Sequence, residues 1–263
     1  MVLNTQNVPP ENLAPKLGKE YIDIVDAFEL TPKVVPPYMH VITQNENQRD
    51  TWKRYSYTAS VIEHLPAYIN GTAEDYMTPP PADGRKLTAV TVSEWTTEAC
   101  FDVASQLFQY DCLTSEHWDR KALFEDRLGI TNVSAYTHTT WGTGWLFTQL
   151  FRSYDAVIVY TKPGWKLENG AIQRMTNAMN AGVITVVENR GVHTEYLGDA
   201  YACAFDDRES LEALLNALAT DEELRTTCRR QAKQIFQAHG LDTQSILAKY
   251  EQALLMTEKS SRY

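Results

Sequence analysis

The stretch YDAVIVY, residues 154–160, decides the fold class. Its centre is an unbroken apolar run whose valine and isoleucine side chains favour extended backbone. A strand that is apolar at every position, and not only at alternate positions, is buried on both faces of its sheet. The sequence therefore predicts a central strand of a parallel sheet that is covered by helices on both sides.

The segments that follow continue the alternation of helix and strand. Residues 170–181 place apolar side chains at helical spacing, Gly182 ends that helix, and residues 183–187 (VITVV) are the next apolar run. Residues 201–205 are a further strand candidate. Asp207 and Asp221 are N-cap residues of two helices, and a last helix is expected from Asp242 to about Met256.

The upstream sequence gives the same alternation. Residues 87–92 predict a buried strand, 98–108 a helix and 133–136 a short strand. Before them lie strand-like runs at 21–25, 39–43 and 61–62. A polar helical stretch at 45–57 lies between the last two runs. The fold class is therefore α/β, a doubly wound parallel sheet of the Rossmann-like type, and we divide the chain into a short N-terminal extension, 1–60, and a Rossmann-like domain, 61–263.

Composition narrows the function classes. The chain has 263 residues and a formal net charge of −10, which argues against a dedicated nucleic-acid binder. No apolar run approaches the roughly 18 residues of a membrane span. Residues 1–19 lack an apolar core with basic flanks, so we expect a cytoplasmic protein.

The four cysteines, Cys100, Cys112, Cys203 and Cys228, lie far apart in the sequence and form no Cys-x-x-Cys motif. This spacing supports neither a zinc site nor a redox motif, so we expect buried, reduced thiols and no metal.

A phosphate site is expected where ligands bind in open parallel sheets, at the carboxyl ends of the strands. The loop after residues 154–160 brings Lys162, Lys166 and Gly170 to the start of a helix. Ammonium groups and the free N–H groups of a helix N-terminus suit a diphosphate. The alternative is a solvated loop with scattered charges.

The next block resembles the donor-site signature of GT-B glycosyltransferases. It comprises Arg174, NAMNAGV at 177–183, GVHTEYLGDA at 191–200 and FDDRESL at 205–211, in the order in which that family places similar segments. The resemblance is most specific over residues 154–215. It implies the C-terminal, nucleotide-sugar-binding half of a GT-B enzyme, with a nucleotide-diphosphate sugar as donor substrate and no other cofactor.

The resemblance also implies site residues. Many retaining members carry two glutamates eight positions apart, and the matching positions here are Asn169 and Asn177, which can hydrogen-bond hydroxyl groups but supply no charge. Glu195 matches a loop glutamate of the family, whereas the nearby His193 is interpreted as a loop residue and not as a catalytic base. The diphosphate would contact Lys162, Lys166 and Arg174.

The nucleotide base is expected beside Tyr136, which ends the predicted strand 133–136, and beside His138 and Thr139, which follow it where the family contacts the base. Hydroxyl groups and aromatic rings suit hydrogen bonding and stacking with a base. No catalytic residue is assigned.

The functional hypothesis is a glycosyltransferase that moves a sugar from a nucleotide-diphosphate donor to an unidentified acceptor. A complete GT-B enzyme has an acceptor domain, and only about 60 residues precede the resemblance, so residues 1–60 are interpreted as a remnant of that domain. A partner subunit or a homo-oligomer would then supply the acceptor side. The alternative is a non-catalytic nucleotide- or partner-binding protein derived from the GT-B fold.

Overall fold

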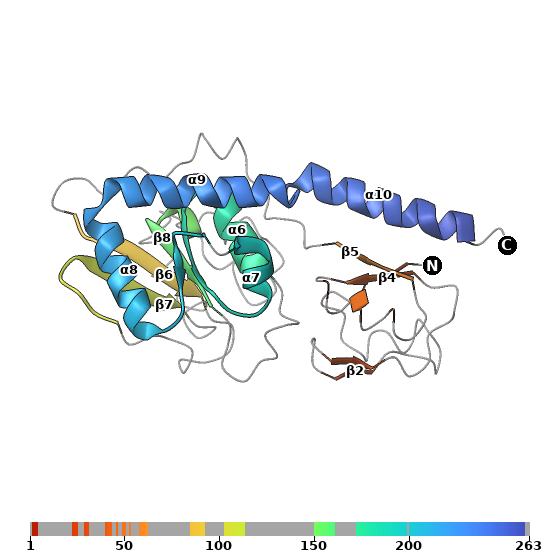
Figure 1. The fold of residues 1–263 in the computed structure, drawn as a ribbon, viewed down its shortest axis with the longest axis horizontal. Helices are drawn as coiled ribbons and strands as arrows, with labels where there is room; N and C mark the ends of the chain where they lie inside the picture. The colour runs from red at the N-terminus through yellow and green to blue at the C-terminus, as the bar shows by residue number, and fades with distance from the viewer. Residues whose placement is uncertain are drawn as a thin grey trace, which may run out of the picture. The chain divides into compact units, whose positions relative to one another are not determined.

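The computed structural model describes residues 2–4, 23–25, 29–31, 40–43, 46, 49–50, 53, 58–62, 85–92, 103–113, 150–160, 172–198 and 200–260 (Figure 1). The chain divides into two compact units. Unit 1 comprises Met1–Leu65, Gly164–Gln173 and Gly240–Tyr263, and unit 2 comprises Pro66–Pro163 and Arg174–His239. The domain boundary that the sequence predicts between residues 60 and 61 stays a prediction.

Unit 2 contains a five-stranded sheet in which every strand pair is parallel. The spatial order is β10-β9-β8-β6-β7, with strands β6 (Leu87–Val92), β7 (Phe108–Leu113), β8 (Ala156–Val159), β9 (Ile184–Glu188) and β10 (Ala204–Phe205). Every residue of β8 and β9 is buried, as their unbroken apolar runs predict. The parallel sheet with its flanking helices confirms the predicted α/β class.

The described helices follow the sheet strands in the chain. They are α6 (Gln173–Ala181), α7 (Val192–Leu197), α8 (Arg208–Thr220), α9 (Glu222–Ala238) and α10 (Thr243–Ser260). In unit 2, α8 packs on β6, β7 and β10, and α9 packs on β9 and α8.

The predicted helix caps are confirmed. The Ser210 amide donates to Asp207 Oδ1 over 2.8 Å at the start of α8, and the Leu224 amide donates to Asp221 Oδ1 over 2.9 Å at the start of α9. Gly182 has a φ of 75°, a left-handed conformation that favours glycine after a helix, and it follows α6 as expected.

The predicted helix at 98–108 is wrong for its described part. Residues 103–107 are not helical, and Phe108 begins the edge strand β7. The interior of β7 is only partly buried and carries Gln109, Tyr110 and Asp111, so it lacks the apolar run by which the other strands were recognised.

Unit 1 contains a three-stranded parallel sheet of order β1-β4-β5, formed by β1 (Val2–Asn4), β4 (His40–Thr43) and β5 (Thr58–Val61). A separate antiparallel pair joins β2 (Asp23–Val25) and β3 (Glu29–Thr31). Ile62, directly after β5, packs in a buried cluster with Ile246, Tyr250 and Ala253 of α10.

The amino ends of three sheet strands in unit 2 meet at Asp155. Its carboxylate accepts hydrogen bonds from Arg85 Nη1 and Nη2 at 2.9 and 2.6 Å, and from Thr88 N and Oγ1 at 2.7 and 2.9 Å. Its backbone amide donates to Thr88 O, and its carbonyl accepts from the Ile184 amide. The start of β8 is thereby fixed to β6 and β9.

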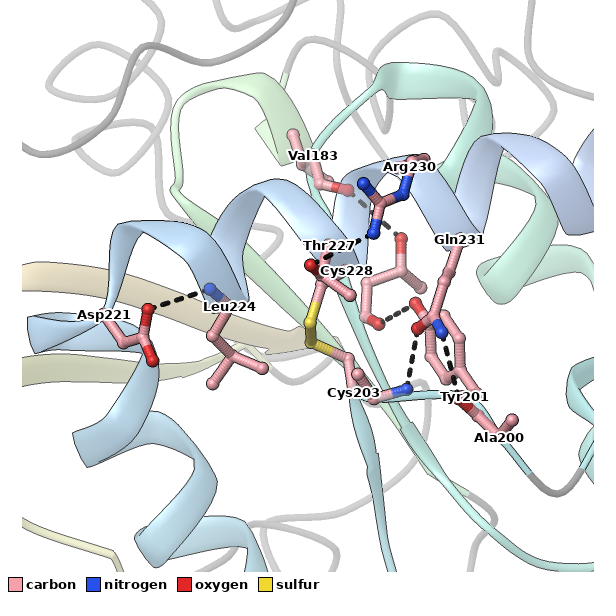
Figure 2. The surroundings of a disulfide bond; sticks show 12 residues. Val183, Ala200, Tyr201, Cys203, Asp221, Leu224, Thr227, Cys228, Arg230 and Gln231 are labelled. Atoms are coloured by element: carbon pink, nitrogen blue, oxygen red, sulfur yellow. Dashed lines mark hydrogen bonds between the residues drawn. A yellow bond between two sulfur atoms is a disulfide. The ribbon is translucent and has the colours of Figure 1, made fainter.

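The expectation of reduced thiols is wrong for the described cysteines. Cys203 and Cys228 form a disulfide with a Cα–Cα distance of 5.7 Å, and Cys112 is also disulfide-bonded (Figure 2). Cys203 and Cys228 are fully buried. The pairing was missed because 25 residues separate the two cysteines, and only the packing of α9 beside the start of β10 brings them together.

The Gln231 side chain reinforces this cross-link. Its Nε2 donates to Ala200 O over 3.0 Å, and its Oε1 accepts from the Ala202 amide over 2.8 Å (Figure 2). The segment before β10 is thus held to α9 by one covalent bond and two hydrogen bonds.

Replacing both cysteines, in the variant Cys203→Ser/Cys228→Ser, is expected to lower the free energy of unfolding by about 2–4 kcal/mol, because the cross-link restricts the unfolded chain. Urea unfolding of the non-reduced proteins measures this loss. Peptide mapping without reductant should recover a linked peptide pair containing Cys203 and Cys228. Free thiols at both positions in the native protein would contradict the assignment.

Candidate functional site

The order of the unit 2 strands defines where a ligand binds. Along the chain the sheet grows from β6 to β7 on one side and then from β8 to β10 on the other, so the direction reverses between β6 and β8. In open parallel sheets the crevice at this reversal, outside the carboxyl ends of the strands, is the usual ligand site. Val92 and Val159 end the two strands that flank it.

Most of the predicted donor-site residues lie outside the described residues. These are Tyr136, His138, Thr139, Lys162, Lys166, Asn169 and Gly170. The lysine loop nevertheless directly follows β8 in the sequence, one of the two strands that flank the reversal point.

Helix α6 carries two predicted site residues that the structure describes. Buried Met175, Ala178 and Met179 anchor the helix in the core. Arg174 is half-buried at its first turn, whereas Asn177 is only 6% exposed. Asn177, which the sequence resemblance matches to a family glutamate, is therefore a neutral and buried side chain.

The turn from β9 into α7 places His193 at the same edge of the sheet. Gly191, with a φ of 58°, adopts the left-handed conformation that begins this turn. His193 and Glu195 are not in a loop, as the sequence predicts, but in α7, where Glu195 is exposed and His193 is buried. The pattern was missed because α7 is only six residues long.

The hydrogen bond of His193 fixes its tautomer. Nδ1 lies 3.2 Å from the carbonyl oxygen of Glu188, and a carbonyl only accepts, so Nδ1 carries the proton and donates. In the neutral ring Nε2 is then a hydrogen-bond acceptor.

Burial lowers the pKa of the His193 imidazole to about 4; the hydrogen bond to Glu188 opposes this shift, and the positive charge of Arg174 adds to it. The ring is therefore neutral near pH 7. Arg174 of α6 is thus near enough to His193 of α7 for its charge to disfavour the protonated ring. The structure thus brings together a cation and a neutral imidazole at the carboxyl edge.

Two longer polar contacts lie at the rest of this edge. Arg190 Nη1 lies 3.9 Å from the Glu188 carboxylate, and Asn189 Nδ2 donates to Asp206 Oδ1 over 3.3 Å, which links the ends of β9 and β10. Among the described residues, no cluster of three or more His, Cys, Asp or Glu side chains is arranged to hold a metal ion. Nor does any helix in the described ranges have the length and apolar character needed to cross a membrane.

Comparison with solved structures decides the fold family. A variant of TarM from S. aureus, crystallised with UDP among its ligands, matches with a TM-score of 0.51 and 14% identity over 81% of this chain. Anabaena HepE in complex with UDP-glucose matches with a TM-score of 0.50 and 12% identity over 83% of this chain. Sucrose-phosphate synthase from Thermosynechococcus elongatus matches with a TM-score of 0.50 and 12% identity over 85%.

The chain has the GT-B glycosyltransferase fold. The resemblance inferred from residues 154–215 is thereby confirmed at the level of fold. The chain covers 43% of the TarM chain, 63% of HepE and 59% of the synthase, so it spans about half the length of the GT-B structures that it matches. No family model and no curated protein matches its sequence.

The lowered pKa of His193 predicts a pH dependence of stability. Below pH 6.5 the unfolded chain binds a proton that folded His193 does not take up until about pH 4, so stability is lost as the pH falls through this interval. The loss is on the order of 3 kcal/mol when complete. Urea unfolding between pH 7 and pH 5 measures its slope.

The matched control is His193→Asn, whose side-chain amide can still donate to Glu188 O but does not titrate. The control should lose stability less steeply over the same interval. Equal slopes for the two proteins would show that His193 does not carry the effect.

Proposed function

We propose that the chain binds a nucleotide-diphosphate sugar at the carboxyl edge of the unit 2 sheet and takes part in transferring the sugar to an acceptor. The observation that carries this proposal is the reversal of strand order between β6 and β8, since the Lys162 and Lys166 loop directly follows β8. The half-buried Arg174 and the neutral His193 at the same edge add one cationic and one polar partner for a ligand.

The proposed chemistry depends on charge in the leaving group. As a glycosidic bond to a diphosphate breaks, negative charge grows on the diphosphate, so cations placed beside it stabilise the transition state more than the ground state. Lys162, Lys166 and Arg174 are the proposed cations, together with backbone N–H groups near Gly170. Tyr136, His138 and Thr139 are proposed to contact the base.

Asn169, Asn177 and Glu195 are proposed to contact the sugar and ribose. Amide side chains hydrogen-bond hydroxyl groups without supplying charge. The uridine nucleotides named in the TarM and HepE structures make uridine diphosphate the first ligand to test. Because this chain spans about half of those proteins, we propose that a partner subunit or a second copy supplies the acceptor side.

A second candidate function is nucleotide binding without catalysis. It is favoured by the 6% exposure of Asn177, which stands where many relatives of this fold carry a glutamate. The cytoplasmic location expected from the sequence stays a prediction, and the Cys203–Cys228 disulfide weighs against it, because disulfides persist mainly in oxidising compartments.

Thermal shift measurements with uridine, guanosine and adenosine diphosphates and their sugars test the donor site. We expect one nucleotide to raise Tm, and we expect Arg174→Met to weaken its binding by about tenfold or more, because a charge-assisted hydrogen bond is lost. Arg230→Met, an exposed arginine on α9, is the matched control and should bind normally.

The outcomes separate the candidates. No stabilisation by any nucleotide would refute the donor site. Binding accompanied by sugar hydrolysis or transfer supports the glycosyltransferase. Binding without turnover points to a missing acceptor-side partner when the chain purifies alone, and to the non-catalytic alternative when a partner co-purifies with it.

A further inference from the structure

The opposite edge of the unit 2 sheet carries an excess of buried positive charge. Asp155, directly before β8, is 1% exposed; Arg85 forms an ion pair with it, and its charge also acts on Arg229, which lies near Arg225. Arg85 binds it through two guanidinium nitrogens, and Thr88 donates to the same carboxylate through its amide and its hydroxyl group. Three of these hydrogen bonds end on Oδ2 and one on Oδ1, so Arg85 and Thr88 take most of the accepting capacity of this carboxylate.

Arg225 and Arg229 lie one turn apart on α9 and share a face of that helix. They are 7% and 9% exposed. Arg225 Nη1 donates to Leu218 O over 2.7 Å. In the part of the chain that the structure describes, Arg225 Nε and Arg229 Nε and Nη2 are buried and have no protein acceptor.

The charges around this pair do not balance. Burial lowers the pKa of the Arg229 guanidinium, the nearby Arg225 lowers it further, and Asp155 opposes both. The two arginines therefore repel one another, and the carboxylate that attracts Arg229 is already bound by Arg85. Two buried arginines that depend on a carboxylate already paired with a third arginine are costly, and an anion beside them adds the missing negative charge.

The guanidinium groups of Arg225 and Arg229 indicate which kind of anion would bind them. Guanidinium groups present N–H pairs in a planar fork that fits the oxygens of a phosphate or a carboxylate. Cys228 lies between the two arginines in the sequence and is bonded to Cys203, so the helix turn that carries them is fixed beside the start of β10 (Figure 2). The donors are thereby held in place before any ligand binds, which favours affinity.

We propose that Arg225 and Arg229 bind a small oxyanion of the phosphate class at the amino edge of the unit 2 sheet. Parallel strands place their amino and carboxyl ends at opposite edges, so this site is separate from the proposed donor site. Inorganic phosphate and the phosphoryl group of a sugar phosphate share the required chemistry.

Isothermal titration of the full chain with inorganic phosphate, at ionic strength held constant with potassium chloride, tests the proposal. We expect saturable binding that Arg229→Met weakens on the order of tenfold or more and that the control Arg230→Met leaves unchanged. A parallel titration with glucose 6-phosphate identifies the source, since tighter binding than inorganic phosphate indicates a metabolite and weaker binding indicates the free ion. Absence of phosphate binding to the wild-type chain, or binding undiminished in Arg229→Met, would overturn the proposal.

The stability of Arg229→Met without phosphate gives an independent readout. Because methionine keeps much of the apolar stem and removes an uncompensated charge, the variant should have a Tm equal to or above that of the wild-type chain in chloride buffer. A purely structural arginine predicts a fall in Tm and no effect of phosphate on the wild-type chain.

Two further measurements keep the test decisive. If Arg229→Met does not fold, Arg229→Lys keeps the charge but loses the planar fork, and it should bind phosphate more weakly than the wild-type chain. Any stabilisation by uridine diphosphate should persist in the folded variant, so failure of this site and failure of the donor site are distinguishable.

Discussion

Asp155 fixes the amino ends of three strands in one register through its carboxylate and its backbone. Its side chain accepts hydrogen bonds from Arg85 and Thr88, while its backbone pairs with Thr88 and Ile184. This register aligns Ala156 with Ala89 of β6 and with Ile184 of β9. Removing one partner of such a buried pair costs several kcal/mol, on the order of 3–5 when both partners are fully buried, and less here because Arg85 is half-exposed. The alignment of the opposite, carboxyl ends depends on this anchor.

The amino and carboxyl edges of a parallel sheet differ chemically, and in this chain they carry different charged and polar side chains. At the carboxyl edge, the half-buried Arg174 acts on a neutral His193 whose tautomer is fixed by Glu188 O. At the amino edge, Arg225 and Arg229 carry more charge than Asp155 can balance, because this single carboxylate is also paired with Arg85. The first edge suits a ligand that combines phosphates with hydroxyl groups, whereas the second suits a compact oxyanion.

The strands and helix ends that depend only on neighbouring residues were predictable from the sequence. β8 and β9 are apolar at every position, and Asp207 and Asp221 precede their helices as N-cap residues, so no tertiary information was needed. β7 was missed because an edge strand tolerates polar residues, and the Cys203–Cys228 bond was missed because it depends on how α9 packs. The burial of His193 was not predicted either, since the six residues of α7 are too few to show a helical periodicity. The placement of Lys162 and Lys166 stays a prediction, since both lie outside the described residues and are known only to follow β8 in the sequence.

Hydrogen–deuterium exchange of the full chain, with uridine diphosphate and separately with inorganic phosphate at a concentration that fills only its tightest site, tests most directly whether the two edges bind different anions. The account predicts that uridine diphosphate slows exchange in peptides covering residues 172–177 and 189–197 and leaves 218–231 unchanged. Phosphate is predicted to slow exchange in 218–231 and to leave the other two segments unchanged. Protection of 218–231 by uridine diphosphate, or of no segment by either ligand, would contradict the account.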